Sequence, residues 1–306
     1  MSNSKLPYIS VIIIAYKRKE FLLNAIKSVV NQTLETKYYQ IIVIKNFTDN
    51  TIDNYIKNKK VIGIVSSEES LTGKLVEALD IAKGHIISFL EDDDLFSNDK
   101  LEIVYNKFKD NDNLCYYHND NISINEKYQK LNIDRGNSIA INMSSISVRK
   151  SILDLNKLKK IDFCVDDYVY LSALESDKNI IGGKEKLTYY MFHNSSSNSN
   201  TEDINEFITF KLAINEHVIK TFKIFSKIFI SNKANDYINQ VVTFMEISTY
   251  IYGGTIKPRN SFNIFKNRDM SLPSRFKIFL GYLLVRFHGN FRYILIKKFL
   301  NNNRKI

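Results

Sequence analysis

The sequence is short of several features, and each shortage excludes a class of protein. Its 306 residues contain only two cysteines, which are too few for a disulfide framework and lie at no metal-ligand spacing. No stretch of 18 apolar residues occurs, so no transmembrane helix is predicted. The apolar start is followed by KRKE instead of a small-residue cleavage site, which argues against a cleavable signal. We therefore expect a protein of the reducing cytoplasm.

Two glycine-rich phosphate-binding motifs are also missing. No G-x-G-x-x-G follows the first predicted strand, which disfavours a dinucleotide-binding fold, and no G-x-x-x-x-G-K-[ST] occurs, which excludes a P-loop enzyme. What is present is ordinary for a globular chain, because 44% hydrophobic and 25% charged residues argue against wholesale disorder. The length is sufficient for one large domain with appendages.

Acidic residues are nearly absent from the end of the chain. Residues 255–306 hold 12 lysines and arginines but a single acid, Asp269, so this segment carries a net charge of +11. The whole chain carries +10, which leaves −1 for residues 1–254. A nucleic-acid enzyme usually spreads its positive charge around the active groove. The concentration of charge at one end instead favours a separate anchoring element, and we expect no nucleic-acid partner.

Strands and helices alternate in the first 90 residues. Strands are predicted over 8–15, 40–45, 61–67 and 85–90, and helices over 19–31 and 71–83. The strands are apolar and rich in β-branched residues, which is typical of strands buried on both faces of a parallel sheet. Gly84 is predicted to cap the C-terminus of the helix over 71–83. The alternation implies right-handed crossovers and a mostly parallel α/β sheet flanked by helices.

The pattern from residue 98 onward is mixed and then helical. Helices are predicted over 98–110, 147–160 and 165–177, strands over 114–118 and 187–192, and polar loops over 119–140 and 193–200. From residue 201 the apolar residues recur at helical spacing until a break at Gly253–Gly254. We therefore expect three parts, which are an α/β domain over 1–200, a helical extension over 201–254 and a basic amphipathic tail over 255–306.

Polar residues follow three of the predicted strands. Ala15, Tyr16 and Lys17 end the first strand, Lys45 and Asn46 end the second, and Glu91, Asp92, Asp93 and Asp94 follow the fourth. Ligands of open parallel sheets bind at the carboxyl ends of the strands. Four adjacent carboxylates repel one another unless a cation neutralises them, and hard oxygen ligands suit Mg²⁺ or Mn²⁺ bound to substrate phosphates. The alternative is a solvated turn in which Asp94 or Asp99 caps the next helix.

Six segments of the chain, taken together, resemble the family-2 glycosyltransferases of the GT-A fold. In order they are SVIIIAYKRKEFLLNAIKSVVNQT, IIVIKNFTDNT, ALDIAKGHIISFLEDDDLFSNDKLE, ISVRKSIL, VDDYVYLSAL and LTYYMFHNSSSNS. Each segment is a weak signal alone, but their common order and spacing over roughly residues 8–198 are specific. The resemblance implies a catalytic domain over 1–200 that moves a sugar from a nucleotide-activated donor to an acceptor hydroxyl, with metal dependence and inversion.

The resemblance also implies roles for the acids and for one histidine. A D-x-D-type motif falls within Glu91–Asp93, where Asp93 takes the place of the metal ligand and Asp92 or Glu91 faces the nucleotide ribose. His193 matches a histidine that often lies near the metal or diphosphate, although a histidine before a polar loop commonly has no special role. The ends of the first two strands, residues 15–17 and 45–46, are then expected to line the donor site.

The expected catalytic base is an acid at the start of a helix. Asp166 and Asp167 match the family's acidic pair, and Asp167 fits the place of the base. An inverting transferase needs one carboxylate to accept the proton of the acceptor hydroxyl while a cation stabilises the departing diphosphate. The alternative for this pair is helix capping and compensation of the helix dipole, and both roles are compatible.

Two departures from the family pattern affect specificity, and one absent residue type excludes a subfamily. Lys45 occupies the place where the family usually has an aspartate that hydrogen-bonds the nucleobase, and a cation cannot accept that bond. The frequent Arg-Asn pair after the third strand is missing, and nearby Lys74 is either a diphosphate ligand or, as we favour, a solvated helix lysine. The chain contains no tryptophan, so it lacks the Q-x-x-R-W motif of processive polysaccharide synthases. We therefore expect transfer of a single sugar.

The basic tail mixes aromatic and long aliphatic residues with cations, as in RFKIFLGYLLVRFHGNFRYILIKKFL over 275–300. This pattern favours an amphipathic helix lying on an anionic membrane surface, which would place the protein on the inner face of the membrane near a glycan or lipid-linked acceptor. The alternative is a tail helix that packs on the catalytic domain and keeps its charges in solvent. Two other functions remain open, which are a sugar-phosphate nucleotidyltransferase and a non-catalytic membrane- or nucleotide-binding relative.

Overall fold

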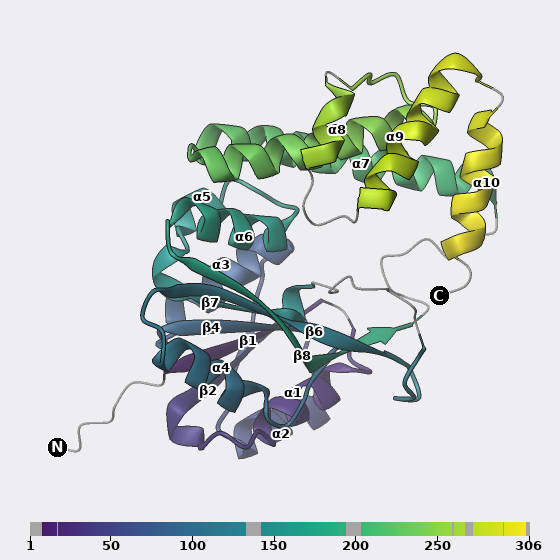
Figure 1. The fold of residues 1–306 in the computed structure, drawn as a ribbon. Helices are drawn as coiled ribbons and strands as arrows, with labels where there is room; N and C mark the ends of the chain where they lie inside the picture. The colour runs from purple at the N-terminus through teal and green to yellow at the C-terminus, as the bar shows by residue number, and fades with distance from the viewer. Residues whose placement is uncertain are drawn as a thin grey trace. The chain divides into compact units, whose positions relative to one another are not determined.

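The computed structural model describes residues 8–16, 18–132, 142–193, 203–258, 260–266, 272–289 and 291–303, the side chains of 299–303 excepted. The chain divides into two compact units (Figure 1). Described residues up to His193 form the first unit, and those from Asp203 onward form the second.

The first unit is built on a mixed eight-stranded sheet with the order β3-β2-β1-β4-β7-β6-β8-β5. Its strands are β1 (Ile9–Ala15), β2 (Tyr39–Lys45), β3 (Ile62–Val65), β4 (Ile86–Glu91), β5 (Leu95–Phe96), β6 (Leu114–Asn125), β7 (Ile146–Arg149) and β8 (Asn179–Phe192). The first four strands in this order pair in parallel, whereas β7 runs antiparallel to both of its neighbours. The expected α/β architecture with a mostly parallel sheet is thereby confirmed.

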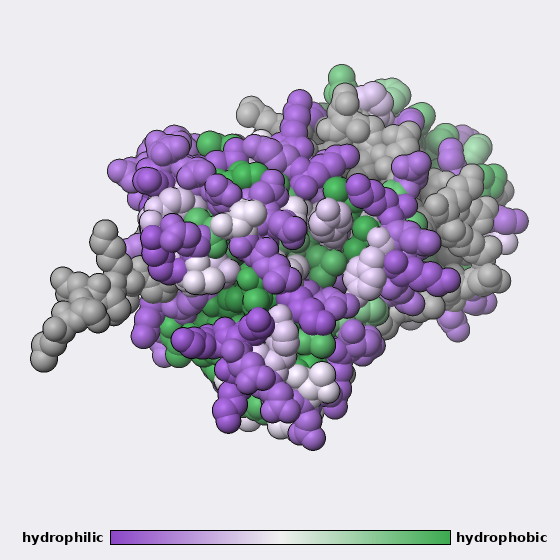
Figure 2. Space-filling view, turned by 90° about the horizontal axis from the view of Figure 1, so that it is seen from below, coloured by the Kyte–Doolittle hydropathy of each residue, from purple (hydrophilic) through white to green (hydrophobic). Residues whose placement is uncertain are grey.

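Helices cover both faces of this sheet (Figure 1). One face carries α3 (Leu71–Ile81), α5 (Leu155–Leu158) and α6 (Val165–Glu175), and the other carries α1 (Leu22–Val30), α2 (Asn50–Asn58) and α4 (Lys100–Lys109). The apolar runs of β1 and β2 are buried because helices lie on both sides of them. Seen from the side of α1, α2 and α4, the surface is mostly hydrophilic with small apolar areas (Figure 2).

Three predictions of local structure are wrong. Residues 147–160 are not one helix, because ISVR forms β7 between β4 and β6, followed by a 3-10 turn and the short α5. The third strand is not buried, since β3 lies at the edge of the sheet with Val65 58% exposed. Gly84 does not cap α3, whose C-cap is Ala82. It instead lies against β1, where a Cβ atom would come within 2.4 Å of the Ser10 backbone nitrogen.

The second unit consists of helices that pack on one another. They are α7 (Ile204–Ile228), α8 (Asn232–Ile251), the 3-10 helix η4 (Ser261–Lys266), α9 (Leu272–Phe287) and α10 (Phe291–Asn303). Ile247 and Ile251 of α8 share an apolar cluster with Ile264, Tyr282 and Val285. The described part of the basic tail therefore packs on the helical extension. None of the helices within the described residues is long and apolar enough to cross a bilayer.

Candidate active site

The predicted site begins at the carboxyl ends of three adjacent strands. Ala15 at the end of β1 lies opposite Lys45 at the end of β2, and Ile14 lies opposite Glu91 at the end of β4. The strand register therefore places the polar residues after β1, β2 and β4 at one edge of the sheet, as predicted. Lys17 is outside the described residues, and partly buried Asn46 follows β2 directly.

Asp92 and Asp93 meet a cationic side chain from the loop between β1 and α1. The Arg18 guanidinium donates from Nη2 to Asp92 Oδ1 at 2.5 Å and pairs through Nη1 with Asp93 Oδ2 at 2.8 Å. His193 Nε2, at the end of β8, lies 2.9 Å from the same Asp93 oxygen. The structure thus brings Asp92, Asp93 and His193 together, and it adds Arg18, which no sequence pattern marked.

Burial and mutual repulsion weaken the acidity of this cluster. Desolvation raises the pKa of Asp92 to about 6, against the opposing effect of Arg18. Although Glu91 keeps contact with solvent, crowding by protein atoms and the neighbouring acids Asp94, Asp93, Asp166 and Asp92 raise its pKa. Asp92 and Asp94 are 2% and 0% exposed, so the alternative of a solvated turn does not hold. Neither Asp94 nor Asp99 caps a helix with its side chain.

A buried polar network holds the turn that carries the acids, and no local sequence pattern predicted it. Asp94 accepts hydrogen bonds from the Met191 backbone nitrogen at 2.9 Å and from Asn142 Nδ2 at 2.7 Å. Fully buried Lys100 donates to the Ser144 carbonyl oxygen at 2.5 Å and to Thr188 Oγ1 at 3.0 Å. The Ser144 hydroxyl in turn accepts from the Glu91 backbone nitrogen at 2.9 Å. These bonds fix the turn that carries the acids between β4 and β8.

Lys45 is 1% exposed and is held by two acceptors. Its ammonium donates to the Phe47 carbonyl oxygen at 2.6 Å and pairs with Asp53 Oδ1 of α2 at 2.8 Å. The ammonium, together with a hydrogen bond from the Asp49 backbone, lowers the pKa of the Asp53 carboxyl against desolvation, the largest influence. At the strand end where the family usually presents an acceptor, this chain presents a buried ammonium paired with a partly exposed carboxylate.

Lys74 is buried, so the prediction of a solvated helix lysine is wrong. Its ammonium donates to the Glu69 carbonyl oxygen at 3.0 Å and lies 4.8 Å from the centre of the Tyr16 ring. Desolvation lowers the pKa of Lys74. Tyr16 is 44% exposed, and its backbone nitrogen donates to Asp92 Oδ2 at 3.4 Å. Tyr16 therefore connects Lys74 with the acid cluster.

The acidic pair of α6 lies at the start of that helix. Cys164, the residue before the helix, has the left-handed conformation with φ of 59° and makes no side-chain cap. Asp166 accepts from the Asp167 backbone nitrogen at 3.0 Å, which satisfies one free N–H group of the first turn. Although Asp166 keeps contact with solvent, protein atoms crowd its carboxyl group and raise its pKa. Its charge contributes to the raised pKa of Glu91, so Asp166 lies within electrostatic reach of the acid cluster.

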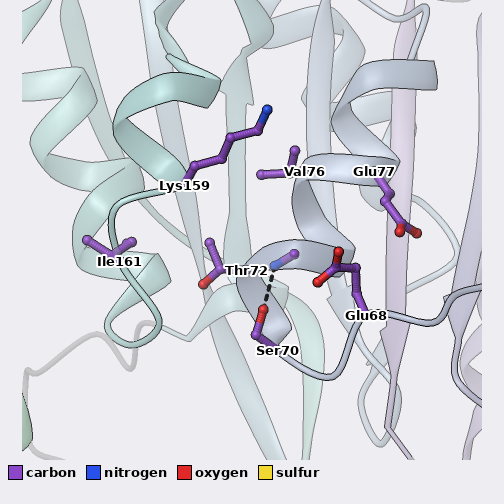
Figure 3. Close-up of a pocket in the computed structure, with 8 residues that line it drawn as sticks. Glu68, Ser70, Thr72, Val76, Glu77, Lys159 and Ile161 are labelled. Carbon is purple, nitrogen blue, oxygen red and sulfur yellow. Dashed lines mark hydrogen bonds between the residues drawn. The ribbon is translucent and has the colours of Figure 1, made fainter.

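A pocket of about 430 Å³ lies beside this site, between the first turn of α3 and the segment before α6 (Figure 3). Ser70 Oγ accepts from the Gly73 backbone nitrogen at 2.9 Å at one side, and Lys159 and Ile161 line the other. The Thr72 hydroxyl is buried there without a hydrogen-bond partner among the described residues. The pocket shares no lining residue with the acid cluster.

The donor atoms of the cluster fit a divalent cation in type but not in number. Asp93 offers a carboxylate oxygen and His193 a ring nitrogen, and these two atoms lie 2.9 Å apart. Mn²⁺ accepts both types of ligand. Within the described residues, no group of three or more His, Cys, Asp and Glu side chains is placed to hold a metal ion. A cation bound there would take its other ligands from water and substrate phosphates, as Mg²⁺ usually does.

Comparison with known proteins settles the family. The family model described as "Glycosyl transferase family 2" matches residues 10–171, which is more than half of the chain. The chain belongs to glycosyl transferase family 2. The matched segment contains the strand ends, the acid cluster and the start of α6, but not His193.

Curated relatives agree with this assignment. The poly(ribitol-phosphate) β-N-acetylglucosaminyltransferase TarP of Staphylococcus aureus is 25% identical over 218 residues, which cover 65% of this chain and 66% of TarP. An uncharacterised glycosyltransferase of Rickettsia conorii is 34% identical over 123 residues, which cover 39% of this chain and 20% of the relative. The chain thus spans between a fifth and two thirds of the length of these relatives.

Solved structures confirm the GT-A fold. Residues 1–349 of TarS from S. aureus in complex with UDP-GlcNAc match with a TM-score of 0.52 at 14% identity, covering 90% of this chain and 79% of that one. The mannosyltransferase PcManGT from Pyrobaculum calidifontis, in complex with GDP-Man and Mn²⁺, matches with a TM-score of 0.54 at 9% identity. That match covers 98% of this chain and 86% of the mannosyltransferase.

Proposed function

We propose that this family-2 glycosyltransferase moves a single sugar from a nucleotide-activated donor to a hydroxyl of a glycan or lipid-linked acceptor, with inversion at the sugar carbon. The observation that carries the proposal is the convergence of Asp92, Asp93 and His193 at the carboxyl edge of β1 and β4, with Asp166 of α6 close enough to contribute to the raised pKa of Glu91. One site thereby combines the His193 imidazole, the acid pair of Asp92 and Asp93, and a separate candidate base on α6.

The donor is expected to lie across the ends of β1, β2 and β4. TarS was solved with UDP-GlcNAc and PcManGT with GDP-Man and Mn²⁺, so nucleotide sugars are the ligands of similar folds. We assign donor contacts to Ala15, Tyr16, Lys17, Lys45, Asn46, Lys74, Glu91 and Asp92. Asp93 and His193 would hold the cation. A bound Mn²⁺ or Mg²⁺ would supply positive charge to the departing diphosphate.

The acids of α6 supply the base. Asp167 would accept the proton of the acceptor hydroxyl, which makes that oxygen a better nucleophile toward the sugar carbon. Asp166 holds the Asp167 backbone through its hydrogen bond and fixes the first turn of the helix. Arg18, which pairs with the acids, and Lys74, which lies near Tyr16, are two cations that would balance the charge of the donor.

Isothermal titration with UDP-, GDP- and dTDP-sugars, with and without Mn²⁺, tests the proposal. We expect at least one of these donors to bind, and to bind more tightly when Mn²⁺ is present. If no nucleotide sugar binds under either condition, the transferase assignment of this site is wrong. The same series shows which nucleobase the Lys45 ammonium favours. We expect a nucleobase that offers hydrogen-bond acceptor atoms to this ammonium to be preferred.

We also propose that the second unit binds an anionic membrane surface on the cytoplasmic side. Leu272, Phe276, Leu280 and Phe287 of α9 are 64%, 57%, 43% and 71% exposed and recur at helical spacing. Exposed cations, including Lys277 and Arg286, belong to the same helix. An apolar stripe flanked by cations is the pattern of helices that lie in the interface of anionic lipid.

A further inference from the structure

The strongest unassigned feature is the contact of Arg18 with both acids of the motif. One guanidinium spans Asp92 and Asp93, with its Nη1 atom also 3.4 Å from His193 Nε2. Desolvation, the largest influence, opposes the charge of Arg18, but the proximity of Asp92, Asp93 and Glu91 outweighs it and raises the pKa of Arg18. The side chain therefore acts as the counter-ion of the acid cluster in the protein alone.

The contact uses the atom that a divalent cation would need. Asp93 Oδ2 is paired at once with Arg18 Nη1 at 2.8 Å and with His193 Nε2 at 2.9 Å. A cation held by Asp93 and His193 would share this oxygen with a second positive charge only a few ångströms away. Because like charges repel strongly in a partly buried site, the guanidinium and the cation compete for the cluster.

The Arg18 side chain is exposed enough to move away from the acids, and its guanidinium can bind a phosphate instead. Its side chain is 32% exposed and comes from the connection between β1 and α1, whereas the Asp92 side chain is 3% exposed. A guanidinium presents five planar donors that match phosphate oxygens in pairs. A diphosphate bound at this sheet edge could therefore accept the Arg18 contacts that the acids give up.

We propose that Arg18 is a tethered competitor of the divalent cation: it keeps the cation out of the acid cluster until a diphosphate arrives and then releases the cluster. The inference rests on the proposed function, since it assumes that this cluster receives a cation together with a nucleotide sugar. Its consequence is ordered loading, in which the cation and the diphosphate strengthen each other's binding through one positioning residue.

The test measures Mn²⁺ binding by electron paramagnetic resonance of the free ion, without nucleotide. Arg18→Met should bind Mn²⁺ at least tenfold more tightly than the unaltered protein, and Arg18→Lys should gain less because an ammonium still neutralises one acid. Lys19→Met is the matched control, since Lys19 carries the same charge in the same loop but pairs with Asp49 at 3.9 Å. Its affinity for Mn²⁺ should stay unchanged. Thermal unfolding verifies that each variant is folded.

A second titration uses the preformed complex of Mn²⁺ and inorganic pyrophosphate. The unaltered protein should bind this complex more tightly than Mn²⁺ alone, and Arg18→Met should lose most of that preference. If Arg18→Met binds Mn²⁺ no more tightly than the unaltered protein, while nucleotide sugars bind with Mn²⁺, competition by Arg18 is wrong and the proposed function stands. If Arg18→Met gains Mn²⁺ affinity but no nucleotide sugar binds either protein, the proposed function fails instead.

Discussion

At the scale of single residues, the site depends on charged groups held away from water. Asp92 and Asp94 are buried acids whose pKa values rise to about 6 and about 7, and Lys100 is a buried cation whose pKa falls well below its usual range. Each of these groups is satisfied by specific partners, among them Arg18 and Ser144. Burial of charged side chains is unfavourable, so it is concentrated at functional sites. These buried charges therefore mark the region of the chain that serves the site.

The acids of α6 can be separated by their amide variants. Asp167→Asn removes the proposed proton acceptor but keeps the shape of the side chain, so turnover should fall by about 10²–10⁴-fold. Donor binding should stay within about threefold, since Asp167 is assigned no donor contact. Turnover is measured as release of nucleoside diphosphate from the donor that titration identifies. Asp166→Asn is the matched variant, and a larger loss there than in Asp167→Asn would move the base to Asp166.

Asp94 gives the metal-free protein a characteristic dependence on pH. Its pKa is 3.8 when unperturbed and about 7 in the folded protein, mainly because of desolvation, so the folded state holds a proton that the unfolded state has lost. Stability should therefore fall as the pH rises from about 4 to about 7 and then level off. The loss relative to Asp94→Asn should be about 2–4 kcal/mol.

Urea denaturation at pH 4.5, 6 and 8 measures this dependence. Asn142 Oδ1 is buried without a partner among the described residues, so its amide can turn to meet the asparagine of Asp94→Asn. Exposed Asp80 provides the control, because Asp80→Asn should keep the pH dependence of the unaltered protein. Parallel pH curves for the unaltered protein and Asp94→Asn would show that this carboxyl group titrates normally.

At the scale of secondary structure, the site is positioned by close contacts between elements. Gly84 links α3 to β4 where the chain passes the backbone of β1. Its own backbone nitrogen donates to Ser10 Oγ at 2.8 Å, so the approach is fixed by a hydrogen bond. This contact sets where β4 begins beside β1, and hence the position of Glu91 at the end of β4.

Gly84→Ala should be strongly destabilising. The added Cβ would lie 2.4 Å from the Ser10 nitrogen and 2.6 Å from the Ile9 carbonyl carbon, and backbone atoms in a central strand cannot move aside cheaply. We expect a loss of about 2–4 kcal/mol in the free energy of unfolding, measured by urea denaturation. Gly289→Ala is the control, because a Cβ there meets no heavy atom within 4 Å. Equal stability of the two variants would contradict the close packing at Gly84.

Prediction from sequence succeeded for elements whose pattern is set by local burial. β1, β2 and β4 were predicted because both of their faces are buried, which gives continuous apolar runs. It failed over 147–160, where ISVRKSIL has apolar residues at a spacing that suits either a helix or a strand. Pairing of β7 with both β4 and β6 decides the strand, and such pairing is not encoded locally.

The site was predictable only in part for a related reason. Asp92 and Asp93 stand out as part of an acid run after a buried strand, whereas Asp166, Asp167 and His193 stand out because the family resemblance marks them. Arg18 and Lys100 read as ordinary surface cations, since burial of a polar side chain depends on partners distant in the sequence. Asn142 and Ser144 carry no local signal at all, because their contacts with Asp94 and Glu91 join segments about 50 residues apart.

At the scale of the whole molecule, charge is divided between the two ends of the chain. Residues 1–254 carry −1, and the important charges there are the acids of the site, whereas residues 255–306 carry +11. The described part of the tail buries Tyr282 and Val285 against α8 but leaves the apolar stripe of α9 exposed. Packing and membrane binding are therefore compatible, since different faces of α9 serve them.

Replacement of two stripe residues should weaken binding to anionic vesicles. Phe276→Ser with Leu280→Ser removes exposed apolar area without touching the cluster shared with α8, so the fold should be kept while the vesicle-bound fraction falls by about tenfold or more. Sedimentation with vesicles of mixed anionic and neutral lipid measures it, and neutral vesicles serve as the control. Undiminished sedimentation of the double variant would rule out this stripe as the membrane contact.

The central claim is that Asp93 and His193 hold a divalent cation for transfer from a nucleotide sugar. Anomalous diffraction from crystals grown with Mn²⁺ and a nucleotide sugar tests it most directly. We expect a manganese peak within coordination distance of Asp93 and His193, in contact with the donor diphosphate, and its loss in Asp93→Asn. A bound donor with no manganese at Asp93, or with manganese held elsewhere, would show that this pair does not hold the cation.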